Sequence, residues 1–198
     1  DLLRMTPNVV DLGIGNELPT VRGIDGSGPN VGANAFLSGT RPRLNLSLDG
    51  RSLTYNEQAF GPQSLWDLDR VEVFLGPQSY IQGRNAIAGA IVMASKDPTF
   101  EWESAFKGGA GNQHSSQLAA MASGPLVEDQ LAFRVSVDRQ RRRSEADLPA
   151  YAPVGDPREV EATTARAKLL FNPAGLRDLT TKLTFNHFGS TAPQNESL

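Results

Sequence analysis

The second half of the chain is dominated by segments in which apolar and polar side chains alternate with a period of two. The clearest segments run from Leu131 to Asp138, from Thr164 to Phe171 and from Leu179 to Asn186, and weaker ones cover residues 102–107 and 117–123. A period of two places successive side chains on opposite faces of a β-strand. We therefore expect five strands, each with one apolar face and one polar or charged face.

The connections between these segments differ in length. Residues 124–130 and 172–178 are short and turn-like, whereas residues 144–159 form a longer stretch with Pro149, Pro153 and Pro157. Short turns alternating with longer loops are typical of transmembrane β-barrels, whose strands are about 9–11 residues long. A soluble antiparallel sheet with one solvated face produces the same alternation, so this pattern by itself leaves both architectures open.

The first half of the chain contains two strands of a different kind. Residues 71–75 alternate until Gly76-Pro77, and the nearly all-apolar segment from Ile87 to Ala94 follows. Between them, Pro77 suits the first position of a helix and Gly83 its end, which predicts one helical turn. A strand that is apolar on both faces has to be covered on both sides. We therefore expect a small sheet that is enclosed by other parts of the protein.

Shorter elements precede these strands. Leu44, Leu46 and Leu48 alternate with polar residues before Asp49-Gly50, which predicts a strand that ends in a type I′ turn. The polar stretches 24–43 and 51–62 are predicted to be loops. Ser64 is suited to cap a single helical turn over residues 64–68, in which Trp66 is interpreted as a packing anchor.

The residues around the two strands of the first half resemble the hallmark that closes the plug domain of the TonB-dependent outer-membrane receptors. The matching residues are Arg70-Val71-Glu72-Val73, Gly76-Pro77, Gly83-Arg84-Asn85-Ala86, Gly89, Ile91 and Lys96-Asp97-Pro98, with Thr20-Val21-Arg22-Gly23 matching an Arg-Gly strand end upstream. The resemblance implies an α+β plug with a small mixed sheet over residues 1–98, its N-terminal part missing. It implies that residues 99–198 form about the first five antiparallel strands of a transmembrane β-barrel, which is incomplete in this chain.

The length of the chain supports the expectation of an incomplete barrel. Plugged outer-membrane transporters use about 22 strands, and at about 9–11 residues each these strands need more than about 200 residues. Only residues 99–198 remain after the expected plug. We therefore expect a fragment of a longer receptor, in which the segment that contacts TonB is absent.

The resemblance also implies a function. In this family the plug closes the barrel, and a scarce ligand such as a ferric siderophore, haem, cobalamin or an oligosaccharide binds on the outer face. The periplasmic protein TonB then pulls on the plug. We expect a location in the cell outer membrane, contact with membrane lipid, and no cofactor. Two plug loops are expected to face the ligand through Ser27, Asn30, Tyr55, Asn56 and Gln58.

Charged plug residues have a second role in this family, in which arginines pair with glutamates of the barrel. The residues expected to make such contacts, or contacts inside the plug, are Arg22, Arg70, Glu72 and Arg84. Leu75 departs from the family pattern, because an arginine or lysine usually precedes Gly76-Pro77. Glu72 inside a covered sheet would need a neutralising partner, for which Arg70 and Arg84 are the candidates.

Composition excludes several other classes of protein. The chain has 198 residues, of which 39% are hydrophobic, and a net charge of −3, which does not favour binding to nucleic acid. It contains no cysteine, which excludes disulfides, thiolate nucleophiles and cysteine-based zinc sites. The longest run of apolar residues and glycine, residues 86–94, is far shorter than the roughly 20 residues of a membrane-spanning helix.

Enzymatic functions find no support in the sequence. No complete dinucleotide fingerprint, Walker lysine or nucleophile elbow is present, and the two histidines, His114 and His187, lack a nearby carboxylate cluster for a metal. We therefore expect no enzyme. The alternative to a transporter is a plug-like binding domain in the periplasm that does not transport.

A basic run in the second half has two interpretations. Arg139 and residues 141–143, all arginine, lie near one end of a predicted strand. They form either a solvated rim or a site for phosphate groups such as those of lipopolysaccharide, since guanidinium groups bind phosphate with two hydrogen bonds.

Overall fold

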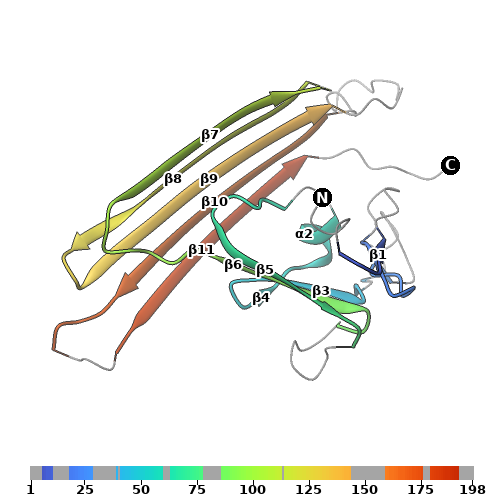
Figure 1. Ribbon diagram of the computed structural model, residues 1–198, viewed down its shortest axis with the longest axis horizontal. Helices are drawn as coiled ribbons and strands as arrows, with labels where there is room; N and C mark the ends of the chain where they lie inside the picture. Colours follow the sequence, from blue (N-terminus) through green and yellow to red (C-terminus); the bar gives the residue numbers. More distant parts are fainter. Residues whose placement is uncertain are drawn as a thin grey trace. The chain divides into compact units, whose positions relative to one another are not determined.

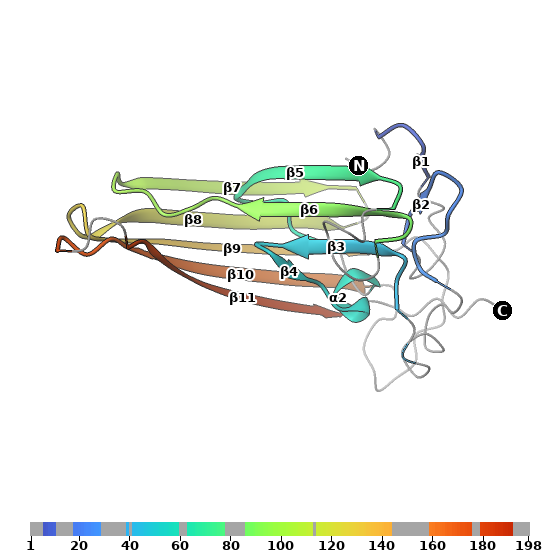
Figure 2. The same cartoon turned by 90° about the horizontal axis from the view of Figure 1, so that it is seen from below.

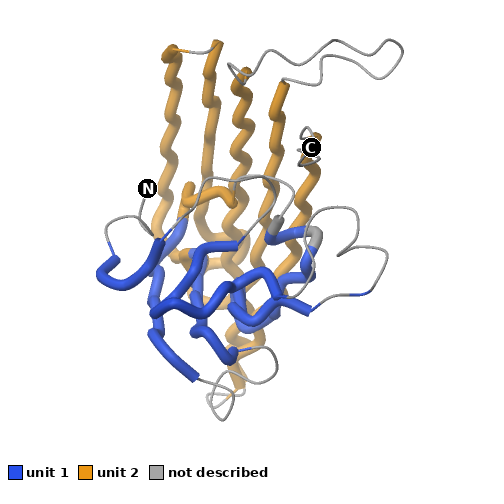
Figure 3. Tube along the Cα trace, turned by 90° about the vertical axis from the view of Figure 1, so that its right-hand side faces the viewer, with its two compact units in different colours: residues 1–60, 68–95, 194–198 blue, residues 61–67, 96–193 orange. Residues whose placement is uncertain are grey.

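The chain folds into two compact β-rich units (Figure 3). The first unit comprises residues 1–60, 68–95 and 194–198, and the second comprises residues 61–67 and 96–193. The structure is a computed structural model of the whole chain, and the residues that it describes are 6–10, 18–28, 39, 41–59, 63–77, 86–112, 114–143, 159–175 and 179–191. The chain therefore enters the second unit twice, first for a short segment and then for the remainder.

The first unit is built on a small mixed sheet, as the sequence predicts. The strand order is β4-β3-β6-β5, which can be followed in Figure 2. Strands β3 and β6 are parallel, and the other two pairs are antiparallel. The strands are β3 (Leu44–Leu48), β4 (Arg51–Ser52), β5 (Leu68–Leu75) and β6 (Gly89–Ser95), and a separate pair consists of β1 (Val9–Val10) and β2 (Thr20–Val21).

The core of this unit forms around β3, all five residues of which are buried. Leu44 is completely inaccessible to solvent, and Leu46 and Leu48 pack with Ile91 and Met93 of β6. Asn45 and Ser47, which alternate with these leucines, are buried as well. Both faces of β3 are therefore covered, and β6 is buried over most of its length in agreement with its apolar sequence.

The turn after β3 is the predicted type I′ turn. Asp49 and Gly50 both have positive φ angles, of 50° and 81°, and Leu48 pairs with Arg51 across the turn. The Asp49 carboxylate accepts hydrogen bonds from the backbone N–H of Ser95 at 2.8 Å and from its hydroxyl at 2.7 Å. The turn is thereby tied to the end of β6.

The polar stretch 51–62 is not only a loop, so that prediction was wrong in part. It contains the short helix α2 (Tyr55–Ala59). Thr54 and Glu57 form a reciprocal capping box, in which Thr54 N–H donates to Glu57 Oε2 at 2.8 Å and Glu57 N–H donates to Thr54 Oγ1 at 3.4 Å. Arg51 adds two hydrogen bonds to the same carboxylate, at 2.7 and 3.0 Å.

The helical turn predicted over residues 64–68 is absent. Ser64 Oγ does accept a hydrogen bond from Trp66 N–H, at 3.2 Å, but Asp67 has a φ of 58° and β5 begins at Leu68. A positive φ ends a right-handed helix, so the chain passes directly from a turn into a strand. The helical turn predicted to follow Pro77 lies outside the described residues.

The second unit contains one antiparallel sheet in which each strand pairs with its neighbours in sequence, in the order β11-β10-β9-β8-β7 (Figure 1). All five strands predicted from the alternating pattern are confirmed. They are β7 (Glu103–Gly111), β8 (Ser115–Val127), β9 (Leu131–Arg143), β10 (Glu159–Phe171) and β11 (Thr181–Thr191). Strands β8, β9 and β10 each have 13 residues, which corresponds to about 43 Å at about 3.3 Å per residue.

The two faces of this sheet differ in chemistry. One face carries exposed large apolar side chains, which include Phe106, Leu118, Val135, Val137, Leu169, Phe171, Leu183 and Phe185. The opposite face carries buried polar and charged side chains, namely Ser123, Arg134, Ser136, Asp138, Thr164, Arg166 and Lys168. The apolar face is therefore exposed and the polar face covered, which reverses the usual arrangement of a soluble protein.

In the part of the chain that the structure describes, no helix has both the length and the apolar character that crossing a membrane requires.

Gly89 provides a test of the packing in the first unit. A Cβ atom at this position would lie 2.4 Å from the carbonyl oxygen of Phe74 in the neighbouring strand. We expect Gly89→Ala to destabilise the β5–β6 pair by about 1–3 kcal/mol, measured as faster amide hydrogen exchange of residues 68–75 and 89–95. The control is Gly109→Ala, because a Cβ there meets nothing within 4 Å. Unchanged exchange in Gly89→Ala would contradict this packing.

Candidate functional site

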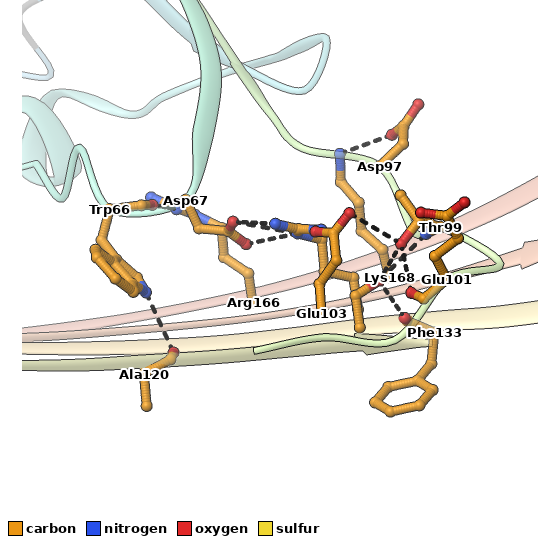
Figure 4. A network of polar contacts seen from close by, with 12 residues as sticks. Trp66, Asp67, Asp97, Thr99, Glu101, Glu103, Ala120, Phe133, Arg166 and Lys168 are labelled. Carbon is orange, nitrogen blue, oxygen red and sulfur yellow. Dashed lines mark hydrogen bonds and ion pairs between the residues drawn. The ribbon is translucent and has the colours of Figure 1, made fainter. Parts of the chain in front are cut away.

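The site with the densest polar contacts lies in the second unit, where a short segment crosses the polar face of the sheet. We call this segment, residues 63–67, the strap. Its contacts reach β8, β9 and β10, and part of the network is drawn in Figure 4. The sequence on both sides of the strap belongs to the first unit.

A buried ion pair holds the C-terminal end of the strap. Arg134 donates to the two carboxylate oxygens of Asp67 at 2.6 Å from Nη2 to Oδ1 and at 2.9 Å from Nε to Oδ2. Its Nη1 reaches Glu103 Oε2 at 3.1 Å. The side chains of Arg134 and Asp67 are only 3% and 5% exposed. A forked pair with this geometry is among the stronger polar contacts in proteins, and either charge would be costly to bury alone.

A second buried carboxylate holds the N-terminal end of the strap. The hydroxyl of Ser64 donates to Asp138 Oδ2 at 2.6 Å. The side-chain amides of Gln117 and Gln140 donate to the same carboxylate at 2.9 and 2.7 Å. Asp138 is 2% exposed, so three neutral donors replace its water of hydration.

The main chain of the strap is also bound directly to the sheet. Arg166 donates to the carbonyl oxygen of Ser64 at 2.9 Å and to that of Trp66 at 2.6 Å. The indole N–H of Trp66 donates to the carbonyl oxygen of Ala120 at 3.2 Å. Because side chains and backbone are both fixed, the strap has one defined conformation on the sheet.

The second crossing of the chain into this unit is anchored next to the strap. The Lys96 N–H donates to the carbonyl oxygen of Asp67 at 3.2 Å. Asp97 accepts from Lys182 at 2.7 Å and from Lys168 at 3.1 Å. Burial acts to raise the pKa of Asp97, but the two lysine hydrogen bonds outweigh it, and the pKa is lowered overall. The two segments by which the chain enters the second unit are therefore bonded to each other, at Asp67 and Lys96.

Three of the residues predicted to face a ligand have side chains that are turned into the first unit. Ser27 is completely buried, and its Oγ accepts from the Leu18 N–H at 2.5 Å. Tyr55 is 9% exposed, and Gln58 is 8% exposed and donates to the Leu53 carbonyl at 2.9 Å. Asn30 and the side chain of Asn56 lie outside what the structure describes.

The predicted charged contacts of the first unit are resolved in part. Arg70, one of the two candidate partners of Glu72, forms an ion pair with it at 2.8 Å. Arg70 also pairs with Asp69 at 3.1 Å. These side chains are exposed, so Glu72 does not point into a covered region. Arg22 has a φ of 49°, and its Nη1 lies 3.6 Å from the position of a Cβ on Gly76. Arg84 lies outside the described residues.

Two arginines of the basic run of β9 are paired with glutamates of the neighbouring strand. Arg139 lies 2.5 Å from Glu161, and Arg141 is bonded to Glu159. Both arginines are more than half exposed. The pairing of these two arginines favours a rim of neutralised charge over a site for phosphate groups, because both guanidinium groups already have a carboxylate partner.

Among the described residues, no group of three or more histidine, aspartate or glutamate side chains is arranged to hold a metal ion.

The strap contacts were missed by sequence reasoning. The inward positions of β9 follow from the period of two, so a charged residue there, such as Arg134 or Asp138, could have been marked as needing a buried partner. The partners themselves carry no such signal, because Asp67 and Ser64 are 67 and 74 residues distant.

The ion pair between Arg134 and Asp67 can be tested with a matched pair of variants in β9. Arg134→Gln leaves Asp67 buried without its partner, and we expect a loss of about 3–5 kcal/mol, seen as faster amide exchange of residues 63–67. Arg139→Gln removes a pair in which the arginine is 60% exposed, and we expect less than about 1 kcal/mol. Equal effects of the two variants would contradict a buried anchor.

The capping box of α2 predicts a pH dependence. The hydrogen bond from Arg51 is the main cause that lowers the pKa of Glu57 from 4.5 to about 2. The stability that the ionised Glu57 carboxylate contributes is complete above pH 4.5 and is lost as the pH falls toward about 2. Because Arg51 is half exposed, we expect about 1 kcal/mol. The melting temperature of Glu57→Gln should lie below that of the wild type at neutral pH and converge with it in acid, whereas the exposed Glu101→Gln should show no such difference.

Comparisons with known proteins agree with this architecture. A family model described as TonB-dependent Receptor Plug Domain matches residues 1–90. The chain is 32% identical over 164 residues to the ferrioxamine receptor of Yersinia enterocolitica, which covers 78% of this chain and 21% of that receptor. It is 30% identical over 104 residues to the ferrioxamine B receptor of Salmonella typhimurium strain LT2, covering 52% of this chain and 14% of that receptor. The chain thus spans about a fifth or less of the length of these relatives.

Solved structures share the fold of the whole chain. The ferric yersiniabactin uptake receptor of Yersinia pestis aligns with a TM-score of 0.78 and 22% identity over 98% of this chain and 29% of its own. The pyoverdine outer membrane receptor of Pseudomonas aeruginosa PAO1 aligns with a TM-score of 0.71 and 19% identity over 96% of this chain and 24% of its own. The resemblance in sequence is thereby confirmed, and the chain belongs to the TonB-dependent receptors, with the plug domain of that family in residues 1–90.

Proposed function

We propose that this chain is part of a TonB-dependent receptor of the outer membrane that takes up a ferric siderophore. Residues 1–98 are the plug, of α+β class with the mixed sheet and α2, and residues 99–198 are the first five strands of the barrel. The observation that carries the proposal is the sheet β7–β11, which follows the plug match and exposes its apolar face.

The exposed apolar face fits contact with membrane lipid. Phe106, Val137, Leu169 and Phe185 come from four different strands and share this face with the other exposed apolar residues. At one end of the strands Trp102 and Phe133 form an edge-to-face pair with ring centroids 5.8 Å apart. Transmembrane barrels carry such an apolar band with aromatic residues at the membrane surface.

The charged pairs mark the other end of the band. The pairs formed by Arg139 and Arg141 with Glu161 and Glu159 lie on the same face of β9 and β10 as the apolar side chains. Ionised groups are unfavourable in the hydrocarbon region and are accommodated near its surface. The alternation between polar and apolar faces along β9 therefore fits a strand that passes through lipid and continues beyond it.

The free edges of the sheet require further strands. Among the described residues, β7 and β11 each pair on one side only. Unpaired backbone N–H and C=O groups are not tolerated in lipid, where only closed barrels satisfy every strand. The remaining strands would come from the rest of the receptor, since related receptors are several times longer than this chain.

The ligand is proposed from the relatives. The two curated relatives are named as ferrioxamine receptors, so a ferric siderophore of that type is the first candidate, ahead of haem, cobalamin or an oligosaccharide. Asn30 and Asn56 remain the proposed ligand-facing residues of the two plug loops. For Ser27, Tyr55 and Gln58 the buried side chains support a role in shaping the two plug loops rather than direct contact with the ligand.

The proposed activity is transport rather than catalysis, with TonB as the partner that supplies energy. The charged contacts of the plug then have structural roles. Arg22, Arg70, Glu72 and Arg84 are proposed to hold the plug together or to contact the barrel, with the Arg70–Glu72 pair as the contact that the structure describes.

Uptake in cells tests this function. The full-length receptor, expressed in a bacterium that lacks other ferrioxamine receptors, should accumulate radioactive iron from ferrioxamine B and fractionate with the outer membrane. Deletion of the host tonB gene should reduce the accumulation to background. Binding of ferrioxamine B without TonB-dependent accumulation would instead support a non-transporting binding protein, and absence of both would overturn the proposed ligand.

A further inference from the structure

The strap belongs to a different unit from the sequence that flanks it. Residues 1–60 and 68–95 belong to the first unit, whereas residues 61–67 cluster with the strands of the second (Figure 3). We propose that the strap is a fixed part of the barrel and remains bound to β8, β9 and β10 while transport displaces residues 1–60. This inference rests on the proposed function, because it assigns the stationary point of the proposed movement.

The contacts of the strap are of a kind that resists detachment. Leaving the sheet would separate Asp67 from Arg134 and Ser64 from Asp138, both of which are buried in the sheet. It would also leave Arg166 without the two carbonyl oxygens to which it donates. Buried charges that lose their partners are strongly unfavourable, so all of these contacts would have to be replaced by water at once.

Residues 96–97, where the chain enters the second unit again, are also bound to the strap and to the sheet. The Lys96 N–H is bonded to the Asp67 carbonyl, and Asp97 is held by Lys168 and Lys182. Strand β5 begins directly after the strap, and strand β6 ends directly before Lys96. Leu68 and Ser95 are paired across these two strands. Both strands of the β5–β6 pair are therefore continuous, at the Leu68–Ser95 end, with residues that are bound within the second unit.

A force applied to the N-terminal side of the plug would meet this anchor before it reached β5. Residues up to 60 precede the strap, and those of them that the structure describes form β1 to β4 and α2. Only residues 68–95 lie between the two anchored crossings. Along the chain, the strap thus separates residues 1–60, whose strand β3 would have to release β6 in order to move, from residues 68–95, which are tethered at both ends.

The absence of cysteine in this chain makes a covalent test direct. In a cysteine-free full-length receptor, Ser64→Cys and Asp138→Cys place two thiols on neighbouring side chains, whose oxygen atoms now lie 2.6 Å apart. Dibromobimane, which becomes fluorescent on joining two thiols, reports how completely they are bridged. Uptake of iron from ferrioxamine B is then compared in the same variant before and after bridging.

If the strap is stationary, bridging should change the rate of uptake by less than a factor of two. A loss of tenfold or more on bridging would overturn the proposal, because it would show that the strap has to leave the sheet. If the unbridged variant binds ferrioxamine B but accumulates no iron while the wild type does, the uptake assay cannot address the strap, and the labelling experiment below decides.

Thiol labelling decides the proposal without reference to uptake. Ser64 is 3% exposed, so the single variant Ser64→Cys should react slowly with a maleimide, and at the same rate in energised cells and in cells lacking TonB. A tenfold increase in energised cells would show that the strap detaches. Ser52→Cys, on the exposed strand β4, verifies that the reagent reaches the plug. If the wild-type receptor accumulates no iron, the proposed function fails, whereas a tenfold increase in labelling in a receptor that does accumulate iron overturns the strap proposal alone.

Discussion

The buried guanidinium of Arg134 is the group on which the division of this chain into units depends. Strand β9 alternates, so Arg134, Ser136 and Asp138 face the same way, and a charge at such a position has to find a partner once it is covered. Asp67 and Glu103 provide carboxylates for it. On the same face of the sheet, Asp138 accepts a hydrogen bond from the hydroxyl of Ser64 in the strap. Arg166 donates to two carbonyl oxygens of the strap. The units therefore separate at the ends of the strap and not at a single linker.

The strands of the second unit have an exposed apolar face and a covered polar face, because successive side chains of a β-strand point to opposite sides. The register pairs Val135 and Val137 of β9 with Ala167 and Ala165 of β10 on the apolar face. The residues between them carry the polar network. A slip of β9 by one residue against its neighbours would exchange its two faces and place Arg134 on the apolar side. The buried ion pairs and the exposed apolar side chains therefore fix one register together.

Much of the fold could be predicted from the sequence, since the signals are local. The five long strands follow from alternation, the turn at Asp49-Gly50 from its need for positive φ, and the buried strand β6 from its apolar run. The capping box between Thr54 and Glu57 is an equally local signal for α2 that was overlooked. The strap could not be predicted, because its contacts with the sheet join residues more than 50 positions apart and follow only from the folded arrangement. The proposed ligand-facing residues show the same limit, since a polar residue in a loop, such as Ser27, is as well suited to support the loop as to contact a ligand.

The glycines of β7 have a mechanical consequence for this edge of the sheet. Gly108, Gly109 and Gly111 lie in the part of the strand farthest from Trp102, and an added Cβ at Gly109 would meet no atom within 4 Å. Glycine in a strand interior allows tight bending where a barrel turns a corner. Among the described residues β7 is an edge strand with one partner, so it can change its curvature at Gly109 without disturbing packed side chains. In the proposed barrel, this glycine-rich edge could thus adjust its curvature when the remaining strands of the receptor pair with it.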